Sequence, residues 1–544
     1  FYMIWLFLLK ILFLFCFLFI AFYFFWLYRA TYWKRRGIPC PDGKLFSGNL
    51  DKMFWEELRL FQMAKWTEQY GKVYGLLTGF QPMLVISDPT MVHELLTSKF
   101  EYFHSRMVSS LEGDVDKNPR MNLANARGAR WKRLRAIANP AFSISNLKKL
   151  MPTIDDSIKV AIELIEKERQ AQPNAPINLH RFFVEMTYDV IARVAMGQRE
   201  SRQFQSEDAK LAVHAFQRLQ NNWFEYLAML FPWLGPTVLR PILLLTVKMR
   251  RDPLLLLTLK IREQVAERRR QKQQQQQNAK HRNADQTESD QQQQQRVPVD
   301  FIDMFLDSVT DEGSIEYRDE LGVFNKAGTK VDRTNTVDEI EMQLQVFLLA
   351  GFDTTANSLG FVSFNLACHP EVQLHLQEEI ATVCISENPT YEELNRLKYT
   401  EAVIKETLRL MPIAEAGETR LCSQTTKLGE FLVEKGTGVA VDVYSFHRNK
   451  ELWGEDADEF RPERWLDNDF PPASAHFYAF GGGPRICIGM RFALLEEKMA
   501  LVRLLRRYSL VKTEQTEKLL NFNSQVVLNP GAVMVKLSQR EENF

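Results

Sequence analysis

The sequence carries no excess charge of either sign, because its 68 lysine and arginine residues balance 68 aspartate and glutamate residues. Composition therefore gives no reason to expect nucleic acid as a partner. Closely paired cysteines are also absent. The six cysteines stand far apart, at Cys16, Cys40, Cys368, Cys384, Cys422 and Cys487. This spacing argues against a disulfide framework or a zinc site and favours a reducing compartment. No internal repeat is visible in the sequence.

Charged side chains are missing from a long stretch near the start of the chain. Residues 11–28 form a run of 18 without charge. As a helix, this run would span about 27 Å, close to the ~30 Å hydrocarbon core of a bilayer. The basic residues that follow are Arg29, Lys34, Arg35 and Arg36. By the positive-inside rule, they put the rest of the chain in the cytosol. We therefore predict a single-pass transmembrane anchor over residues 1–30.

A cleaved signal peptide is the alternative to an anchor. Cleavage requires small residues after the apolar run. This chain has bulky residues there instead, namely Trp26, Leu27 and Tyr28. We therefore favour an uncleaved anchor, followed by a basic and proline-rich linker over residues 31–48 and by one large domain over residues 49–544. The chain begins with Phe1 rather than Met, which leaves open whether native residues precede it.

The large domain is mostly helical in its sequence pattern, with short strand signals. Residues 73–77 and 82–86 favour a β-hairpin with Gly79 in its turn. Further strands are expected near residues 438–441 and 532–536, and the last of these could close a small sheet. These patterns predict a mainly α fold with small β-sheets.

Two glutamine tracts, at residues 273–277 and 291–295, lie within a charged stretch over residues 268–297. Because this stretch has almost nothing apolar to bury, we expect a disordered or frayed surface loop. A domain boundary is the alternative. Residues 300–306 resume an apolar helix at once, which favours an insertion within one domain.

Apolar residues are concentrated before this loop, at residues 231–234 and 254–257. Apolar residues at helical spacing most often belong to a core. With an anchor in the same chain, these segments could instead dip into the bilayer surface.

The longest helix in the pattern begins at Thr336, which forms a capping box with Glu339 three residues later. The helical pattern persists to Cys368 and His369, and Pro370 stops it. A helix of this length would measure roughly 50 Å. It is therefore long enough to cross the whole domain.

Small and polar residues interrupt the apolar centre of this helix. They are Ala350, Gly351, Asp353, Thr354 and Thr355. Glycine, aspartate and threonine are poor residues for a buried helix interior. A threonine hydroxyl can also bond to the carbonyl four residues earlier and bend the helix. A packing kink is one explanation of the pattern, and the two small residues also open a groove at the same place.

A glycine-rich loop near the C-terminus carries Cys487, and the residues after Gly489 are typical of a helix. Cys487 is therefore expected at a helix N-terminus, where free N–H groups and the positive end of the helix dipole favour thiolate over thiol. A thiolate is a ligand for iron. Gly483 and Gly489 leave room for a flat cofactor near the backbone, and Arg485 could pair with its carboxylate. A buried structural thiol is the alternative.

The residue order of this loop, Phe-x-x-Gly-x-Arg-x-Cys-x-Gly over residues 480–489, closely resembles the haem-binding loop of the cytochrome P-450 family. Residues 347–355 resemble the oxygen-activating motif of that family. Glu406 and Arg409, followed by residues 460–465, resemble its helix pair and later arginine loop. The resemblance covers essentially the whole chain. It implies the cytochrome P-450 fold, a triangular helical prism, preceded here by a transmembrane helix.

The resemblance also implies roles for individual residues. Cys487 would be the axial ligand of the iron in haem b, and Thr354 and Asp353 would hold oxygen and deliver protons. Haem contacts are implied for Arg485, Trp131, Arg135, Arg420, Arg106, Phe480 and Gly489. A structural lock is implied for Glu406, Arg409 and Arg464. Trp465 stands where the family often has Phe. The substrate pocket is expected to include Phe347, Ala350, Ile413 and Ala414.

The resemblance implies an NADPH-dependent haem-thiolate monooxygenase of eukaryotic microsomal type. Such an enzyme inserts one atom of O2 into a lipophilic substrate, such as a xenobiotic, steroid, fatty acid or terpenoid. Its electrons would come from NADPH through the flavoprotein cytochrome P-450 reductase, at the endoplasmic reticulum membrane. Two alternatives are an isomerase or dehydratase that rearranges peroxides and a membrane haem protein without enzymatic activity.

Overall fold

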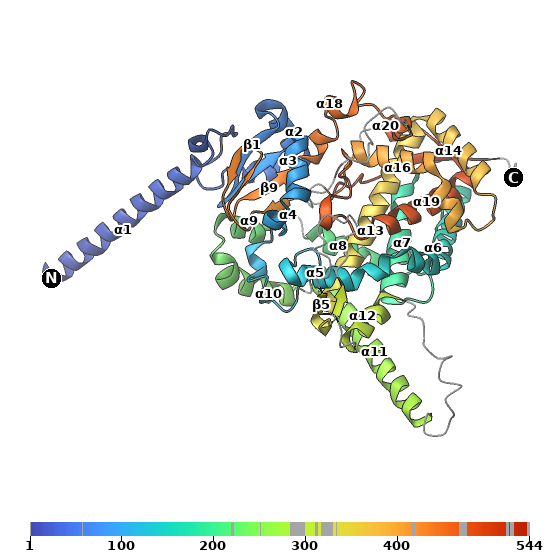
Figure 1. Ribbon diagram of the computed structural model, residues 1–544, viewed down its shortest axis with the longest axis horizontal. Coiled ribbons are helices and arrows are strands. Elements are labelled where there is room, and N and C mark those ends of the chain that lie inside the picture. Colours follow the sequence, from blue (N-terminus) through green and yellow to red (C-terminus); the bar gives the residue numbers. More distant parts are fainter. Residues whose placement is uncertain are drawn as a thin grey trace.

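The structure is a computed structural model, and Figure 1 shows its arrangement. It describes residues 2–56, 58–218, 222–250, 252–282, 300–310, 314–316, 330–332, 334–414, 419–466, 476–517, 522 and 527–540. The α-helices are α1 (Tyr2–Ala30), α2 (Arg59–Tyr70), α3 (Pro89–His93), α4 (Phe100–Phe103), α5 (Gly128–Ala138), α6 (Ile144–Ala171), α7 (Leu179–Met196), α8 (Asp208–Arg218), α9 (Trp223–Leu230), α10 (Arg240–Met249), α11 (Pro253–Arg282), α12 (Phe301–Thr310), α13 (Val337–Cys368), α14 (Pro370–Val383), α15 (Tyr391–Arg396), α16 (Lys398–Leu410), α17 (Val443–Phe446), α18 (Lys450–Trp453), α19 (Met490–Arg507) and α20 (Glu514–Glu517).

The strands are short by comparison. They are β1 (Val73–Thr78), β2 (Gln81–Ile86), β3 (Ile177–Asn178), β4 (Ser314–Glu316), β5 (Lys330–Asp332), β6 (Thr419–Leu421), β7 (Thr426–Leu428), β8 (Phe431–Val433), β9 (Gly438–Val441), β10 (Tyr508–Val511) and β11 (Met534–Gln539). The prediction of a mainly α fold with small sheets is confirmed.

The predicted hairpin forms the edge of a four-stranded sheet in the order β1-β2-β9-β6. β1 pairs with β2 antiparallel, and β2 pairs with β9 parallel. Gly79 in the hairpin turn has φ +65°, and a Cβ there would lie 2.5 Å from the carbonyl oxygen of Met229. Near the C-terminus, β11 pairs with both β10 and β3. The last strand therefore closes a small sheet as predicted, with its bounds two to three residues later than expected.

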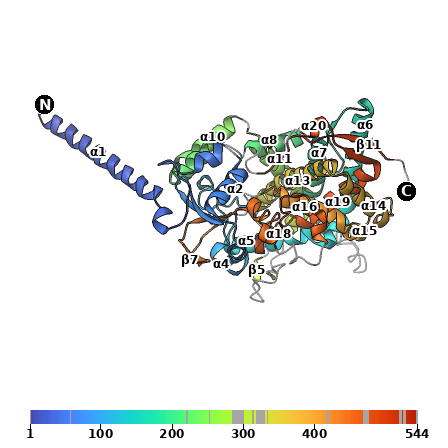
Figure 2. The ribbon, with the colours of Figure 1, turned by 90° about the horizontal axis from the view of Figure 1, so that it is seen from above.

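The long helix α13 runs through the middle of the domain in both views (Figures 1 and 2). Its predicted capping box is present, because the Thr336 side chain accepts from the Glu339 N–H and the Glu339 side chain accepts from the Thr336 N–H. α7 packs along it, and their buried apolar side chains belong to one large core. The predicted start and end of this helix are confirmed.

The apolar N-terminal helix α1 projects away from the domain (Figure 1). Within the described residues it is the one helix that is long and apolar enough to cross a membrane. Its last turns contact the domain through Trp26, which is 1% exposed. The centre of the Trp26 ring lies 5.5 Å from the centre of the Phe46 ring, 6.1 Å from that of Phe80 and 6.2 Å from that of Phe231.

The glutamine-rich stretch differs in part from the expected loop. α11 continues through the first glutamine tract to Arg282, so the expectation of a loop is wrong over residues 268–282. Leu257, Ile261 and Val265 bury the start of this helix in the core. Glutamine, arginine and lysine are good helix formers and prolong a helix once it has begun. Residues 283–297 lie outside the described residues.

Candidate functional site

The loop that carries Cys487 is held by its own backbone. The Cys487 N–H donates to the carbonyl of Phe480 at 2.9 Å, and the Gly481 N–H donates to that of Tyr478 at 2.8 Å. Gly483 has φ +64°, and a Cβ there would lie 1.8 Å from the Leu96 carbonyl oxygen. Only glycine fits this approach. The loop leads directly into α19, so Cys487 lies at a helix N-terminus as predicted.

The electrostatics of the Cys487 thiol differ from the expectation. Its side chain is accessible, yet the protein around it excludes most water, and this burial raises the pKa of the thiol. The N–H groups of Gly489 and Met490 and the charges of Arg135 and Arg106 act in the opposite direction. The expectation of a lowered pKa is therefore wrong for the chain by itself. Desolvation of the charged form outweighs the helix terminus.

The arginine and tryptophan residues expected at the cofactor come from distant segments and lie close together. The Arg485 guanidinium carbon lies 4.7 Å from the centre of the Trp131 ring. Arg485 also donates to the carbonyls of His104 and Ala124, and Arg106 donates to the same Ala124 carbonyl at 3.2 Å. The structure thus brings together residues from three places: α5, the segment after α4, and the loop over residues 480–489 that carries Cys487, called the cysteine loop below.

Two further arginines adjoin this group. Arg135 on α5 donates to the carbonyl of Ile486 at 2.9 Å, next to the cysteine in the chain. Arg420 on β6 is completely buried. The next residue, Leu421, donates its N–H to the carbonyl of Ser105 at 2.8 Å, which puts β6 beside the segment that carries Arg106.

This set of donors fits haem. An accessible sulfur can ligate iron, and guanidinium groups can bind the two carboxylates of the porphyrin. The loop around Cys487 packs closely against the Leu96 carbonyl at Gly483, where a side chain would collide with it. Arg106 and Arg135 lie near enough to Cys487 to influence the pKa of its thiol, so the cations and the sulfur belong to one site.

The centre of α13 presents a small accessible patch on a helix that is otherwise mostly buried. Ala350 is exposed, and Gly351 and Thr354 are partly exposed. The Thr354 hydroxyl donates to the Ala350 carbonyl at 2.7 Å. This is the bond to the carbonyl four residues earlier that the sequence predicted.

Asp353 points into the protein instead and is 5% exposed. Burial raises the pKa of its carboxyl group to about 6. An oxygen of that group lies 3.1 Å from the side-chain nitrogen of Asn357. Thr187 on α7 holds the same turn of α13, because its hydroxyl donates to the Phe352 carbonyl at 2.8 Å.

The four residues expected in the pocket wall have different surroundings. Phe347 is buried, and its ring packs against the aromatic rings of Phe142, Phe301 and Phe305. Ile413 is 7% exposed, and its carbonyl accepts the N–H of Leu528 at 2.8 Å. Ala350 and Ala414 are exposed. Their place in a substrate pocket stays a prediction.

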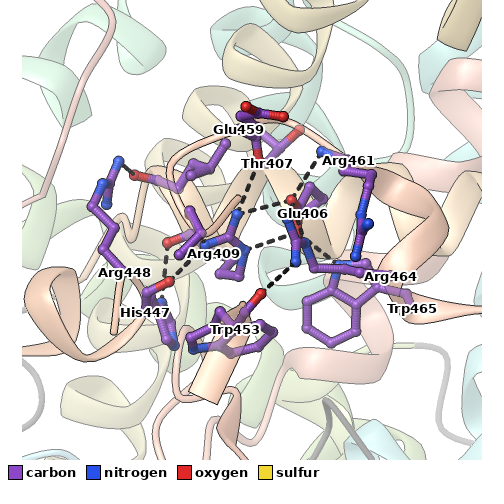
Figure 3. Close-up of polar contacts among 12 residues, drawn as sticks. Glu406, Thr407, Arg409, His447, Arg448, Trp453, Glu459, Arg461, Arg464 and Trp465 are labelled. Atoms are coloured by element: carbon purple, nitrogen blue, oxygen red, sulfur yellow. Dashed lines mark hydrogen bonds and ion pairs between the residues drawn. The ribbon is translucent and has the colours of Figure 1, made fainter. Parts of the chain in front are cut away.

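Glu406, Arg409 and Arg464 meet in a completely buried cluster (Figure 3). Arg409 Nε lies 2.8 Å from Glu406 Oε2, and Arg464 Nε lies 2.9 Å from Glu406 Oε1. Trp465 adds a contact that the sequence did not reveal, because its indole N–H donates to Glu406 Oε2 at 3.0 Å. A phenylalanine at this position could not make that bond.

Sequence reasoning also missed His447, which lies beside Arg409 in this cluster (Figure 3) and also contacts Tyr478, just before the cysteine loop. Its Nδ1 lies 3.1 Å from the Arg409 carbonyl, and its Nε2 accepts the N–H of Tyr478 at 3.0 Å. Burial lowers the pKa of His447 to about 3, with a further contribution from the charge of Arg409. The ring is therefore neutral and carries its proton on Nδ1. No local sequence signal marks this residue, because both partners lie far away in the chain.

Comparison with known proteins gives a consistent result. The family model for cytochrome P450 matches residues 38–537. The protein "Putative cytochrome P450 cyp-13B1" of Caenorhabditis elegans is 39% identical over 536 residues, which cover 96% of this chain and 98% of that protein. "Putative cytochrome P450 CYP13A1" of the same organism is 37% identical over 530 residues, with coverage of 96% and 97%. The match extends almost from end to end, and it makes this chain a member of the cytochrome P450 family, an oxidoreductase with the monooxygenase activity that haem iron gives to that family.

Proposed function

We propose that the enzyme is an NADPH-dependent monooxygenase of lipophilic small molecules, with haem b bound through Cys487. Xenobiotics, steroids, fatty acids and terpenoids are the candidate substrates. The observation that carries the proposal is the accessible sulfur of Cys487 at the N-terminus of α19, beside the positive charges of Arg135 and Arg106. Iron would hold this sulfur as the thiolate, because a metal cation offsets the desolvation that otherwise favours the thiol.

The haem carboxylates would be held by the arginine group around Cys487. Arg485 and Arg106 share a backbone acceptor, and Trp131 stacks on Arg485. With Arg135 and Arg420, this group offers cations from four separate segments of the chain. Phe480 and Gly489 would lie against the ring, since they bound the loop on either side of Cys487.

When bound, haem supplies the redox centre at which O2 is reduced and one oxygen atom passes to the substrate. Thr354 lies on the accessible patch of α13. Its hydroxyl group donates a hydrogen bond to the Ala350 carbonyl. The hydroxyl oxygen can therefore still accept a hydrogen bond from water. Asp353, with its pKa near 6, can both hold and release a proton close to neutral pH. We assign Asp353 as the proton donor and Thr354 as the group that positions water.

The remaining parts of the chain have roles in this proposal that follow from their positions. α1 would anchor the enzyme in the endoplasmic reticulum membrane as a single span, residues 31–48 would be the linker, and the domain after it would lie in the cytosol. Exposed apolar side chains on and before α10, among them Trp233, Leu245 and Met249, support contact of this region with lipid. Electrons would arrive from NADPH through cytochrome P-450 reductase.

A reduced carbon monoxide difference spectrum tests the central assignment. The full-length enzyme in detergent or nanodiscs is expected to show the red-shifted band of thiolate ligation, and Cys487→Ser should abolish it. Cys40→Ser, on the partly exposed linker cysteine, is the matched control and should keep the band. A normal band in Cys487→Ser would overturn the assignment.

Turnover tests the reaction class. With the reductase and NADPH, we expect a panel of lipophilic compounds to include at least one that gains an oxygen atom, traced with 18O2. Rearrangement of a lipid peroxide without NADPH, together with no oxygenated product from any compound, would instead support an isomerase or dehydratase.

A further inference from the structure

The base of α1 packs against the domain. Trp26, near the C-terminal end of the helix, is 1% exposed, and the centre of its ring lies 5.5 Å from that of Phe46. Phe22, one turn earlier, stacks on Phe46 with 5.9 Å between the ring centres. Phe25 stacks on Phe80 at 6.3 Å. The last turns of the helix are therefore joined to the domain, whereas almost all residues before them are exposed.

Polar groups fasten the same junction to two separate parts of the domain. The guanidinium group of Arg29 donates to the carbonyl of Phe80, in the turn between β1 and β2, and its carbon lies 4.1 Å from the centre of the Phe80 ring. Beyond the end of α1, the Tyr32 hydroxyl donates to Glu434 Oε2 at 2.8 Å. Arg36 binds the other oxygen of Glu434 at 2.6 Å. Glu434 directly follows β8, so the junction is held at two points.

Trp33 fixes the chain that leaves α1. It is 3% exposed, and its indole N–H donates to the carbonyl of Leu76 in β1 at 2.7 Å. Gly75 leaves space for the ring, because a Cβ there would lie 2.2 Å from a ring carbon of Trp33. The Gly75 N–H donates to the Pro39 carbonyl at 2.8 Å. Residues 32–39 therefore lie against β1 and do not form a loose tether.

The helix itself contains no hinge. α1 runs without a break from Tyr2 to Ala30 and has neither glycine nor proline, which are common causes of sharp kinks in helices. The part before Phe22 rises about 30 Å at ~1.5 Å per residue. This is enough by itself to cross the ~30 Å hydrocarbon core of a bilayer. The direction of the span relative to the domain therefore follows from the way its base is docked.

The junction also reaches the chain between α9 and α10. The Phe80 N–H donates to the carbonyl of Met229 at 2.9 Å, and the Phe80 ring lies 5.4 Å from that of Trp233, centre to centre. Trp233 is 49% exposed, and Leu245 on α10 is 60% exposed. Both views place α10 on the side of the domain from which α1 emerges (Figures 1 and 2). Because tryptophan is enriched at membrane–water interfaces, this side of the domain suits the lipid headgroup layer.

We propose that α1 and the catalytic domain form one rigid unit joined at Trp26, which sets the tilt of the domain on the bilayer and holds Trp233 and α10 in the lipid headgroup layer. The inference rests on the membrane anchoring in the proposed function. It adds that residues 31–48, expected to be a linker, do not let the domain turn freely about its anchor. One fixed face of the domain therefore rests on lipid.

The distance between two spin labels on the full-length holoenzyme in nanodiscs tests the rigid joint. Cys16, an exposed residue of α1, carries one label. Glu430→Cys, at an exposed position between β7 and β8, carries the other. Cys40→Ser and Cys368→Ser remove the two partly exposed thiols, and Cys487 is protected by iron in the holoenzyme. Pulsed electron paramagnetic resonance then gives the distribution of distances between α1 and the domain.

We expect one narrow distribution. A protein with a flexible Gly-Ser insert after Ala30 provides the reference for a loose tether, because such sequences behave as random coils. Its distribution should be several-fold wider. A distribution in the protein without the insert that is as wide as this reference would overturn the proposal.

Substitution of Trp26 shows whether this residue makes the joint. Trp26→Ala leaves a gap among three aromatic rings, so the distribution should widen several-fold. Trp5→Ala removes the same side chain from an exposed position on α1 and should leave the width unchanged. The reduced carbon monoxide spectrum of each variant checks that the domain is folded around haem. A distribution in Trp26→Ala as narrow as that of Trp5→Ala would contradict the assignment of the joint.

A spin label at Met249→Cys tests which face rests on lipid. Met249 lies at the end of α10 and is 75% exposed. In the wild-type background, we expect its label to relax faster with oxygen, which concentrates in lipid, than with a water-soluble nickel chelate. Trp26→Ala should shift this balance toward the chelate. A label that is as open to the chelate as that at Glu430→Cys would show that α10 lies in water, against the proposal.

Extraction of membranes with alkaline carbonate separates failure of this inference from failure of the proposed anchor. If carbonate releases the wild-type protein, α1 does not span the bilayer and the anchoring in the proposed function fails. If the protein stays with the membrane and its distance distribution is broad, the anchor stands and the rigid joint fails.

Discussion

The Arg485 guanidinium group stacks on the ring of Trp131, with 4.7 Å between the guanidinium carbon and the ring centre. Trp131 comes from α5 and Arg485 from the cysteine loop, so this one contact joins two distant parts of the site. A cation–π pair of this kind contributes on the order of 0.5–2 kcal/mol.

Replacement of Trp131 tests what that contact does. Trp131→Leu should lower the fraction of protein that retains haem and lower its melting temperature, because Arg485 loses the ring that orients it. Trp131→Phe keeps a ring and should retain most of the haem. Haem content per protein and thermal melting are the measurements. Equal haem content in all three proteins would show that the contact does not support cofactor binding.

Thr354 is the polar group on the accessible patch of α13. Thr354→Ala should keep the carbon monoxide spectrum but lower product per NADPH several-fold and release hydrogen peroxide, because water near the site loses its acceptor. Thr354→Ser keeps the hydroxyl and is the matched control. Product and peroxide are measured together with NADPH consumption. If Thr354→Ala remains fully coupled, the hydroxyl has no part in proton delivery.

Trp465 offers a test of the buried cluster around Glu406. Trp465→Phe removes the indole N–H that donates to the carboxylate at 3.0 Å. Because a hydrogen bond to a buried charge contributes about 1.5–3 kcal/mol, the free energy of unfolding should fall by a comparable amount. The same substitution at Trp223, which is 64% exposed, should change it by less than about 0.5 kcal/mol. Chemical denaturation followed by circular dichroism measures both.

His447 should make stability depend on pH. Its pKa falls from an ordinary value of 6.5 to about 3 on folding, so between these values the unfolded chain binds the extra proton. The stability that neutral His447 contributes is therefore complete above about pH 6.5 and is lost as the pH falls toward 3, by up to ~1.4 kcal/mol per pH unit.

Thermal melting between pH 5 and 8 measures this dependence. His447→Phe removes the titrating ring, so its melting temperature should fall less steeply on acidification, from a lower starting value. His375→Phe, at an exposed position, is the control and should follow the wild type. Parallel curves for all three proteins would contradict a neutral His447.

The helices and the cysteine loop could be foreseen because local chemistry specifies them. The capping box at Thr336 and the stop at Pro370 delimit α13 without reference to other parts of the chain. The first glutamine tract shows the limit of such reasoning. Its composition favours a loop, but the buried start of α11 at Leu257 and Ile261 provides a helix for it to continue.

The residue types of the proposed site follow from the sequence, but the balance between nearby charge and desolvation at Cys487 does not. The position of Cys487 at a helix N-terminus was clear from the sequence, whereas the desolvation that raises the pKa of its thiol depends on everything packed around it. Trp465 was recognised as aromatic, but its bond to Glu406 requires two elements to meet.

By itself, the sequence determined the helical framework and the apolar N-terminal helix, and its motifs marked the family and the residues that we propose to bind iron and carry protons. Those depend on composition and on spacing within a few turns of chain. Only the tertiary structure decided that His447 joins Arg409 to Tyr478, just before the cysteine loop, and that Thr187 on α7 holds the turn of α13 that carries Asp353. These contacts arise where distant elements exclude water together, because a buried polar group must find its partner on whichever element packs against it.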